Sequence, residues 1–181
     1  MKAETLLHRM GRAAALLTMA LACAATAHSV WAAQALPTRI AVFDFELEDG
    51  SAGASVAGNR DVDNALLRSI SDEVRKTIAQ SGRYQLVAIS DSDTQALQGQ
   101  SLRTCNGCET KIAAARGADQ SLTGVVRRIT RTEYAVSFQV RDTKTGDVLA
   151  QRESDLRMGA SDSWSRGAVS LIKTHLLDVP R

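Results

Sequence analysis

Runs of apolar residues divide the chain into elements, and the clearest run lies early. Ile40 to Phe43 is an unbroken apolar stretch that ends in Asp44-Phe45. It is too short for a helix and rich in strand formers, so we predict that 39–45 is the central strand of an α/β domain. A strand that is apolar on both faces requires helices on both sides of its sheet.

A helical pattern follows. Asp61 opens an amphipathic helix, which Ser81-Gly82 ends and whose apolar residues recur every four positions: Val62, Leu66, Ile70, Val74 and Ile78. A second strand over 84–89 completes a strand-helix-strand unit, which forces parallel pairing. The intervening segment 46–59 is acidic, then rich in glycine and serine, which indicates a loop. It lies at the carboxyl end of a central strand, where α/β sheets usually bind ligands.

The second half predicts two short helices, three strands and a closing helix. The helices cover about 90–98 and 109–116, and the strands cover 121–129, 133–141 and 147–156. The middle strand alternates apolar and polar residues, so we expect it to be half buried and antiparallel to its neighbours. Ser161 is expected to cap the closing helix, which buries Trp164, Ala168, Leu171, Ile172, His175 and Leu176. The predicted fold is a single α/β (α+β) domain, with helices packed against a mixed sheet of about five strands.

The first 35 residues form a different kind of segment. They begin with basic residues, continue with an apolar run over 13–27, and contain small-x-small triplets that end at Ala27 and Ala35. This pattern predicts a signal peptide over 1–35, cut between 27 and 35, and a single periplasmic domain over 36–181. The run is shorter than the about 20 residues that a membrane span needs. No second apolar run follows, so we expect no integral membrane span.

An alternative for the mature chain is a lipoprotein that is acylated on Cys23. Ala20-Leu21-Ala22-Cys23 resembles a lipobox, with alanine in place of the usual leucine three positions before the cysteine. An acyl chain on Cys23 would tether an otherwise soluble domain to a membrane.

The charge balance of the exported part excludes some partners. The chain has 22 basic and 20 acidic residues, of which Lys2, Arg9, Arg12 and Glu4 lie in the predicted signal. The 19 basic and 19 acidic residues that remain cancel. We therefore expect no nucleic acid and no anionic membrane surface as a partner.

Cys105 and Cys108 are the thiols of the predicted exported chain, and an oxidising compartment favours a bond between them. A structural disulfide would fix the entry to the following helix, although so small a ring constrains little of the chain. Redox exchange is an alternative, because Cys-x-x-Cys at a helix start is the motif of exchange catalysts. A polar loop before Cys105 and the lack of an opposing cis-proline argue against it. A metal or partner site is the third interpretation.

Other candidate residues are few. His175 is the histidine that remains after the signal, and one histidine cannot form both a catalytic triad and a zinc site, so we expect no catalytic residue, metal or cofactor. Asp44 either caps the following loop or contributes to a ligand site. Trp164 is either a core anchor or a partner contact, and Arg166 is open in the same way.

The chain resembles an uncharacterised family of secreted proteobacterial proteins, a domain of unknown function. The matching pieces are 40–47, 81–84, Cys-Asn-Gly-Cys-Glu at 105–109, Gly-Ala-Asp at 117–119 with Gly124-Val125, and Ser-Trp-Ser-Arg-Gly at 163–167. The order of elements is more distantly similar to the amino-terminal domain of TolB and to the periplasmic domains of curli secretion lipoproteins and penicillin-binding-protein activators. The resemblance implies a binding or assembly module, at the level of fold analogy.

We therefore predict a non-catalytic periplasmic binding or accessory module, whose partner is an unknown envelope protein or a small ligand. Asp44, Trp164, Arg166 and the segment 46–60 are expected near that partner. The alternatives are a thiol-disulfide exchange protein that uses Cys105 and Cys108, and a small-ligand carrier that uses the loop after Phe45.

Overall fold

The computed structural model describes residues 36–52, 60–95 and 101–179. Pro37–Arg181 forms one unit, and the description below concerns that unit alone. The predicted signal peptide and the lipobox cysteine Cys23 lie outside the described residues.

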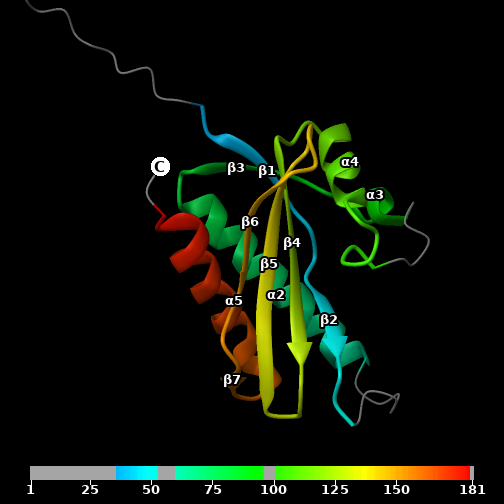
Figure 1. Cartoon of the computed structure of the whole chain (residues 1–181), viewed down its shortest axis with the longest axis vertical. Helices are drawn as coiled ribbons and strands as arrows, with labels where there is room; N and C mark the ends of the chain where they lie inside the picture. The colour runs from blue at the N-terminus through cyan, green and yellow to red at the C-terminus, as the bar shows by residue number, and fades with distance from the viewer. Residues whose placement is uncertain (1–35, 53–59, 96–100, 180–181) are drawn as a thin grey trace, which may run out of the picture. The chain divides into compact units, whose positions relative to one another are not determined.

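The described residues form a seven-stranded mixed sheet (Figure 1). Its main path runs through β3 (Tyr84–Val87), β1 (Thr38–Val42), β4 (Gln120–Arg128), β5 (Glu133–Asp142) and β6 (Val148–Glu153). β2 (Glu46–Asp49) also pairs with β4, and β7 (Arg157–Met158) also pairs with β5. β1 is parallel to β3 and β4, whereas β5 is antiparallel to all its partners, as predicted.

Helices cover the sheet on both faces, which confirms the mixed α+β domain. They are α2 (Arg60–Gln80), α3 (Asp91–Gln95), α4 (Cys108–Ala115) and α5 (Trp164–Ile172). α5 is preceded by the 3₁₀ turn η1 (Ser161–Ser163) and followed by the π-helical turn η2 (Lys173–Leu177).

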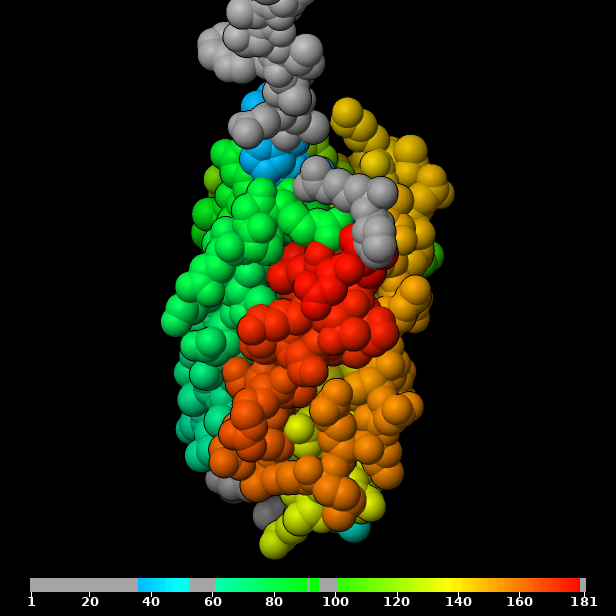
Figure 2. All heavy atoms as spheres, turned by 90° about the vertical axis from the view of Figure 1, so that its left-hand side faces the viewer, coloured from blue at the N-terminus to red at the C-terminus, as the bar shows by residue number. Residues whose placement is uncertain are grey.

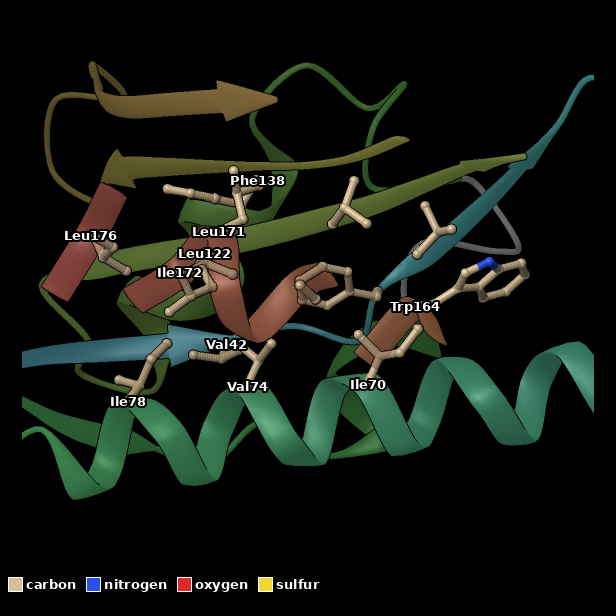
Figure 3. Packing of buried hydrophobic residues seen from close by; sticks show 14 of the residues in the cluster. Val42, Ile70, Val74, Ile78, Leu122, Phe138, Trp164, Leu171, Ile172 and Leu176 are labelled. Carbon is tan, nitrogen blue, oxygen red and sulfur yellow. The ribbon is translucent and has the colours of Figure 1, made fainter. Parts of the chain in front are cut away.

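The central strand β1 is buried on both faces, as its unbroken apolar run predicted. Ile40 and Val42 belong to the main core, which β4, β5, α2 and α5 complete (Figure 3). Ala41 and Phe43 point the other way, into a smaller cluster with Ala113 of α4. Burial at alternate positions on both faces is what a strand between two helical layers requires.

Two expectations about single elements were wrong. The start of the predicted loop 46–59 is strand β2, because Glu46–Asp49 finds a parallel partner in β4. Val62 is 59% exposed, since a strict four-residue repeat advances about 40° per step beyond a full turn and drifts off the buried face. The main path of the sheet has the five strands expected, and the four-residue β2 and the two-residue β7 pair off this path to give seven.

The closing helix also differs from the prediction. Ser161 begins the 3₁₀ turn instead of capping the helix, which starts at Trp164. His175 is exposed, whereas Leu176 is buried. The chain passes from α-helical to π-helical hydrogen bonding at Lys173, so the residues that face the core change phase there.

Candidate functional site

Asp44 lies on a bulge where the central strand changes partner position. Val42 is opposite Leu122, but Glu46 is opposite Val125, so three residues of one strand face two of the other. The extra residue bends the strand and leaves Asp44 exposed. Bulges are common next to functional sites.

Helix α2 holds this bulge with two polar side chains. The buried Ser71 hydroxyl accepts a 2.9 Å hydrogen bond from the backbone N–H of Phe45 and donates one of 2.7 Å to the Leu67 carbonyl. Arg75 donates from Nε and Nη2 to the Val42 carbonyl at 3.2 and 3.0 Å, and from Nη2 to Asp44 Oδ1 at 2.6 Å. Asp44 therefore pairs with Arg75 of the helix, whereas the sequence had left open a cap on its own loop and a place in a ligand site.

A hollow of about 340 Å³ adjoins this ion pair. Arg75, Val42 and the segment Leu86–Ile89 line it, so it opens where the parallel strands β1 and β3 end. This is the edge at which α/β sheets usually place ligands. The structure thus joins Asp44 to a concave surface, through a helix residue that the sequence did not single out.

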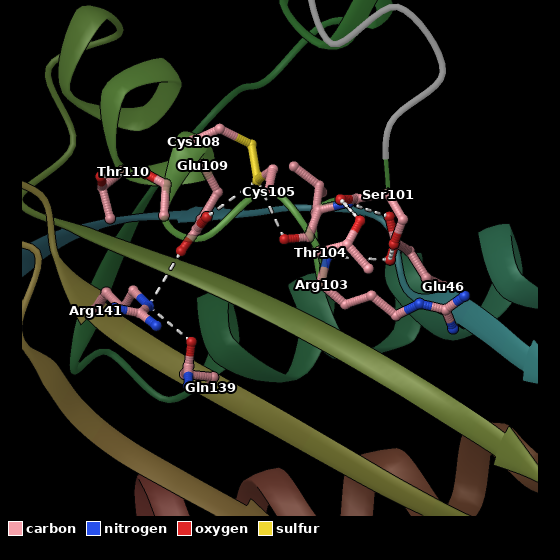
Figure 4. The surroundings of a disulfide bond; sticks show 12 residues. Glu46, Ser101, Arg103, Thr104, Cys105, Cys108, Glu109, Thr110, Gln139 and Arg141 are labelled. Carbon is pink, nitrogen blue, oxygen red and sulfur yellow. Dashed lines mark hydrogen bonds and ion pairs between the residues drawn. A yellow bond between two sulfur atoms is a disulfide. The ribbon is translucent and has the colours of Figure 1, made fainter.

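Cys105 and Cys108 are joined by a disulfide at the start of α4 (Figure 4). The two residues between them, Asn106 and Gly107, have φ angles of 53° and 94°. Asn and Gly are the residue types that adopt this left-handed backbone most readily, so the Asn-Gly pair lets the tight loop close. The pairing agrees with the expectation, and it is compatible with both a structural and an exchange role.

Two glutamates hold the disulfide loop from either side. Glu46 of β2 accepts backbone hydrogen bonds from Leu102 at 2.7 Å and Arg103 at 3.3 Å, and the hydroxyl of Ser101 also donates to it. Glu109, 3% exposed, lies beside the disulfide with one carboxylate oxygen 3.3 Å from Arg141 Nε of β5 (Figure 4). The loop is therefore anchored to two strands.

Trp164 is 2% exposed and lies in the core, so its side chain is a core anchor in this structure (Figure 3). Its ring centroid is 6.4 Å from that of Tyr134, and the guanidinium carbon of Arg128 lies 4.9 Å from its ring centroid. A cation over an indole is an attractive arrangement. The buried Trp164 side chain is therefore not accessible to a partner in this structure.

Arg128 connects Trp164 with the segment 46–60 that was expected near it. Nη1 of Arg128 donates to Asp49 at 2.8 Å and to Asp63 at 3.1 Å, and Nη2 also bonds Asp63. Burial lowers the pKa of Arg128, but the bonds and charges of Asp63 and Asp49 outweigh it, so the pKa is raised. Burial likewise pushes the pKa of Asp49 up, and bonds from Ser51 and Arg128 bring it below its usual value. Arg128 therefore links Asp49, Asp63 and the Trp164 ring through ion pairs and a cation–π contact.

Arg166 is exposed on α5, and no side chain among the described residues pairs with it. It follows Trp164 by two positions, but the contacts of Trp164 do not include it. Of the three residues predicted for a partner or ligand surface, Asp44 and Arg166 are exposed and Trp164 is buried.

The β6–β7 edge of the sheet was not predicted as a site, but it exposes a group of large hydrophobic side chains. Four large hydrophobic residues on or beside these strands are exposed: Val148 at 46%, Leu149 at 51%, Leu156 at 56% and Met158 at 72%. Five of the six β6 residues are exposed, and no described strand pairs beyond β6. Figure 2 shows this orange segment at the surface alongside the red carboxyl-terminal helix. The sequence predicted a strand over 147–156, but nothing in that segment indicated that it lies at an edge of the sheet.

No helix among residues 36–52, 60–95 and 101–179 is long and apolar enough to cross a membrane.

The protein has a single mixed α+β domain with helices on both faces of its sheet. The chain belongs to the family described as "Protein of unknown function (DUF2380)", whose profile matches residues 38–176. This confirms the expected membership of an uncharacterised family. No curated protein matches the sequence.

Several solved structures are similar to this chain. The LpoB C-terminal domain from Salmonella enterica has a TM-score of 0.47 at 15% identity, covering 68% of this chain and 84% of that one. The PelC dodecamer from Paraburkholderia phytofirmans has 0.45 at 18%, covering 81% and 92%. TolB from Acinetobacter baumannii has 0.42 at 13%, covering 80% of this chain and 29% of TolB.

Proposed function

We propose that this protein is a non-catalytic binding or accessory module of the cell envelope, exported by the segment 1–35, and that it engages a partner protein along its β6–β7 edge. The observation that carries the proposal is the group of exposed hydrophobic side chains on and beside that free edge. Folded proteins usually protect such edges with charge, proline or a covering element.

The chemistry of the edge favours an extended protein segment as the occupant. The outer backbone groups of β6 are available for strand addition, a mode in which main-chain hydrogen bonds supply affinity and alternate side chains supply specificity. Val148 and Leu149 offer apolar contacts at one end of the strand, and Arg152 offers a positive charge at the other, where Glu153 is already paired with Arg127. The 19 basic and 19 acidic residues of 36–181 cancel and give no net attraction for a polyanion.

Site-specific photocrosslinking in the producing cells tests the proposal. A photoreactive residue at Leu149 is expected to give one discrete adduct with another envelope protein, and Val148→Asp is expected to reduce its yield at least about tenfold, since a buried unpaired charge is costly. The same photoreactive residue at Lys76, exposed on the opposite element α2, is the matched control and is expected to give no such adduct.

Three outcomes would contradict the proposal: no adduct at Leu149, the same adduct from Lys76, or an adduct with the mass of two copies of this chain. The last result would replace the partner protein with self-association. Intact mass of the purified adduct distinguishes it from the expected result.

A small-ligand carrier is a second candidate, favoured by the hollow beside Asp44 and Arg75. Its volume lies within the about 300–1,000 Å³ range of ligand pockets. Native mass spectrometry of the protein from the envelope is expected to show a bound small molecule that Ala88→Trp, which fills the hollow, removes. A ligand-free protein in both cases would eliminate this candidate.

A further inference from the structure

We propose that Cys105, Cys108 and Glu109 form a redox-gated site for a thiophilic divalent cation such as Zn²⁺, open to the ion only after the disulfide is reduced. Nothing in the proposed partner binding requires such a site, so the two proposals stand separately.

Glu109 places a buried carboxylate beside the disulfide. Its side chain is 4% exposed, and Oε2 lies 3.8 Å from Cys105 Sγ, which carries no hydrogen while the disulfide is closed. Oε1 lies 3.3 Å from Arg141 Nε, but the hydrogen of that nitrogen goes to Gln139 Oε1 at 2.7 Å. Among the described residues, no N–H or O–H group donates a hydrogen bond to this carboxylate.

The Arg141 guanidinium offsets part of the desolvation cost of this carboxylate, but no N–H or O–H group of the described residues donates to Oε2, which is unfavourable for a buried oxygen. In the oxidised state Oε2 lies beside Cys105 Sγ (Figure 4). This disulfide sulfur carries no hydrogen to donate and no negative charge with which to bind a cation together with the carboxylate. Reduction changes this, because it creates a thiol donor or, after loss of the proton, a thiolate beside the carboxylate. In the reduced protein the Glu109 carboxylate therefore gains either a hydrogen-bond donor or a second anionic ligand for a cation.

The three donor atoms lie close together. The sulfurs of Cys105 and Cys108 and a carboxylate oxygen of Glu109 all lie within 4.8 Å of one another. Two ligands of one Zn²⁺ are at most about 4.6 Å apart, given Zn–S bonds of about 2.3 Å. Small side-chain shifts therefore suffice once the bond between the sulfurs opens. Cys-x-x-Cys is also the usual spacing of a zinc-binding cysteine pair.

The charges agree with a divalent ion. Two thiolates and one carboxylate carry three negative charges, and a divalent cation leaves one, which the neighbouring Arg141 guanidinium balances. Three protein ligands leave a fourth coordination position for water or for an external ligand, as in open zinc sites.

The chemistry is balanced by a dithiol reductant. One thiolate of the reductant attacks a sulfur of the Cys105–Cys108 bond, its second thiol resolves the mixed disulfide, and the reductant leaves as its own disulfide. The protein then holds two thiols. Binding of the ion deprotonates both and releases two protons, because thiolate is the form that binds metal.

Cobalt titration of the full chain tests the proposal, with a phosphine as reductant because it does not compete as a thiol. The reduced protein is expected to bind one Co²⁺ with the sulfur-to-metal charge-transfer absorption of thiolate ligands, and Zn²⁺ is expected to displace it. The oxidised protein is expected to show no such absorption. Glu109→Gln is expected to weaken binding at least about tenfold, since even a supporting residue costs about that much.

Lys111→Gln, on the exposed face of the same helix, is the matched control and is expected to bind Co²⁺ like the unchanged protein. Circular dichroism of each reduced variant establishes that it is folded, and the absorption spectrum reports the ligands independently of affinity. The proposal is overturned if the reduced, folded protein shows no thiolate absorption with Co²⁺, or if Glu109→Gln and Lys111→Gln bind equally well.

Discussion

The ring of Phe45 occupies the space that a side chain at position 124 would need. An added Cβ on Gly124 would stand 2.3 Å from two ring atoms of Phe45, which is itself 2% exposed. This close approach explains why a glycine lies inside strand β4, where glycine is otherwise unfavourable.

We expect Gly124→Ala to lower the free energy of unfolding by about 1–3 kcal/mol, the usual cost of overpacking a core. Urea unfolding measures it. Gly50→Ala is the matched control, because its added Cβ would meet only the Arg128 carbonyl at 3.6 Å, an ordinary contact. Phe45→Leu in the Gly124→Ala background is expected to recover part of the loss. Equal stability of the two alanine variants would contradict this account.

The residues around the candidate sites show why sequence analysis reached only part of them. The motif Cys105-Asn-Gly-Cys108 was visible as a pattern, and the structure joins its cysteines. Glu46 and Arg141, which hold the same loop, lie far away in sequence and carry no local signal of their role. Ordinary surface residue types become informative only after the sheet register is known.

At the scale of elements, α3 depends on a single carboxylate. The described part of α3 is held to its surroundings through Asp93. Asp93 accepts hydrogen bonds from the N–H and hydroxyl of Ser90 at 2.8 and 2.6 Å and from Arg116 Nε, at the end of α4, at 2.8 Å. These bonds, those of Arg116 first, lower the pKa of Asp93 to about 2.

Because the folded pKa of Asp93 lies below the about 3.9 of an unfolded aspartate, its contribution to stability is present above pH 4 and is lost as the pH falls through about 2. We expect wild type to be more stable than Asp93→Asn at pH 6.5, with the difference shrinking steadily between pH 4 and pH 2. Thermal unfolding of both proteins at each pH measures it. Asp162→Asn, an exposed carboxylate outside any ion pair of the described residues, serves as control. A difference that is constant over this range would refute the prediction.

The strands divide into those that local pattern reveals and those that it does not. β1, β4 and β5 follow from apolar runs and alternation, because each buries its own side chains. β2 has the sequence Glu-Leu-Glu-Asp, which on its own favours a loop. It becomes a strand because β4 supplies a backbone partner together with Arg127 and Arg128, which pair with Glu48 and Asp49. That support comes from residues distant in sequence, so no local window contains it.

At the scale of the whole molecule, the main core links elements from one end of the described chain to the other. Ile40 of β1, Ile70 of α2, Phe138 of β5 and Leu176 near the carboxyl end belong to one buried cluster, together with Trp164. The smaller cluster on the other face joins it through the central strand β1. Loss of any one layer would expose the others, which predicts a single cooperative unfolding transition.

A version of the chain that starts at Pro37 tests this prediction, because it keeps Trp164 as its only tryptophan. Fluorescence then reports the packing of one side chain under Arg128, while far-ultraviolet circular dichroism reports the secondary structure of all elements. We expect the two urea transitions to coincide in midpoint and slope, as two-state unfolding requires. The Phe43→Leu variant perturbs the smaller cluster and is expected to shift both signals together. A tryptophan transition that precedes the loss of circular dichroism would instead show that α5 and its contacts unfold as a separate unit.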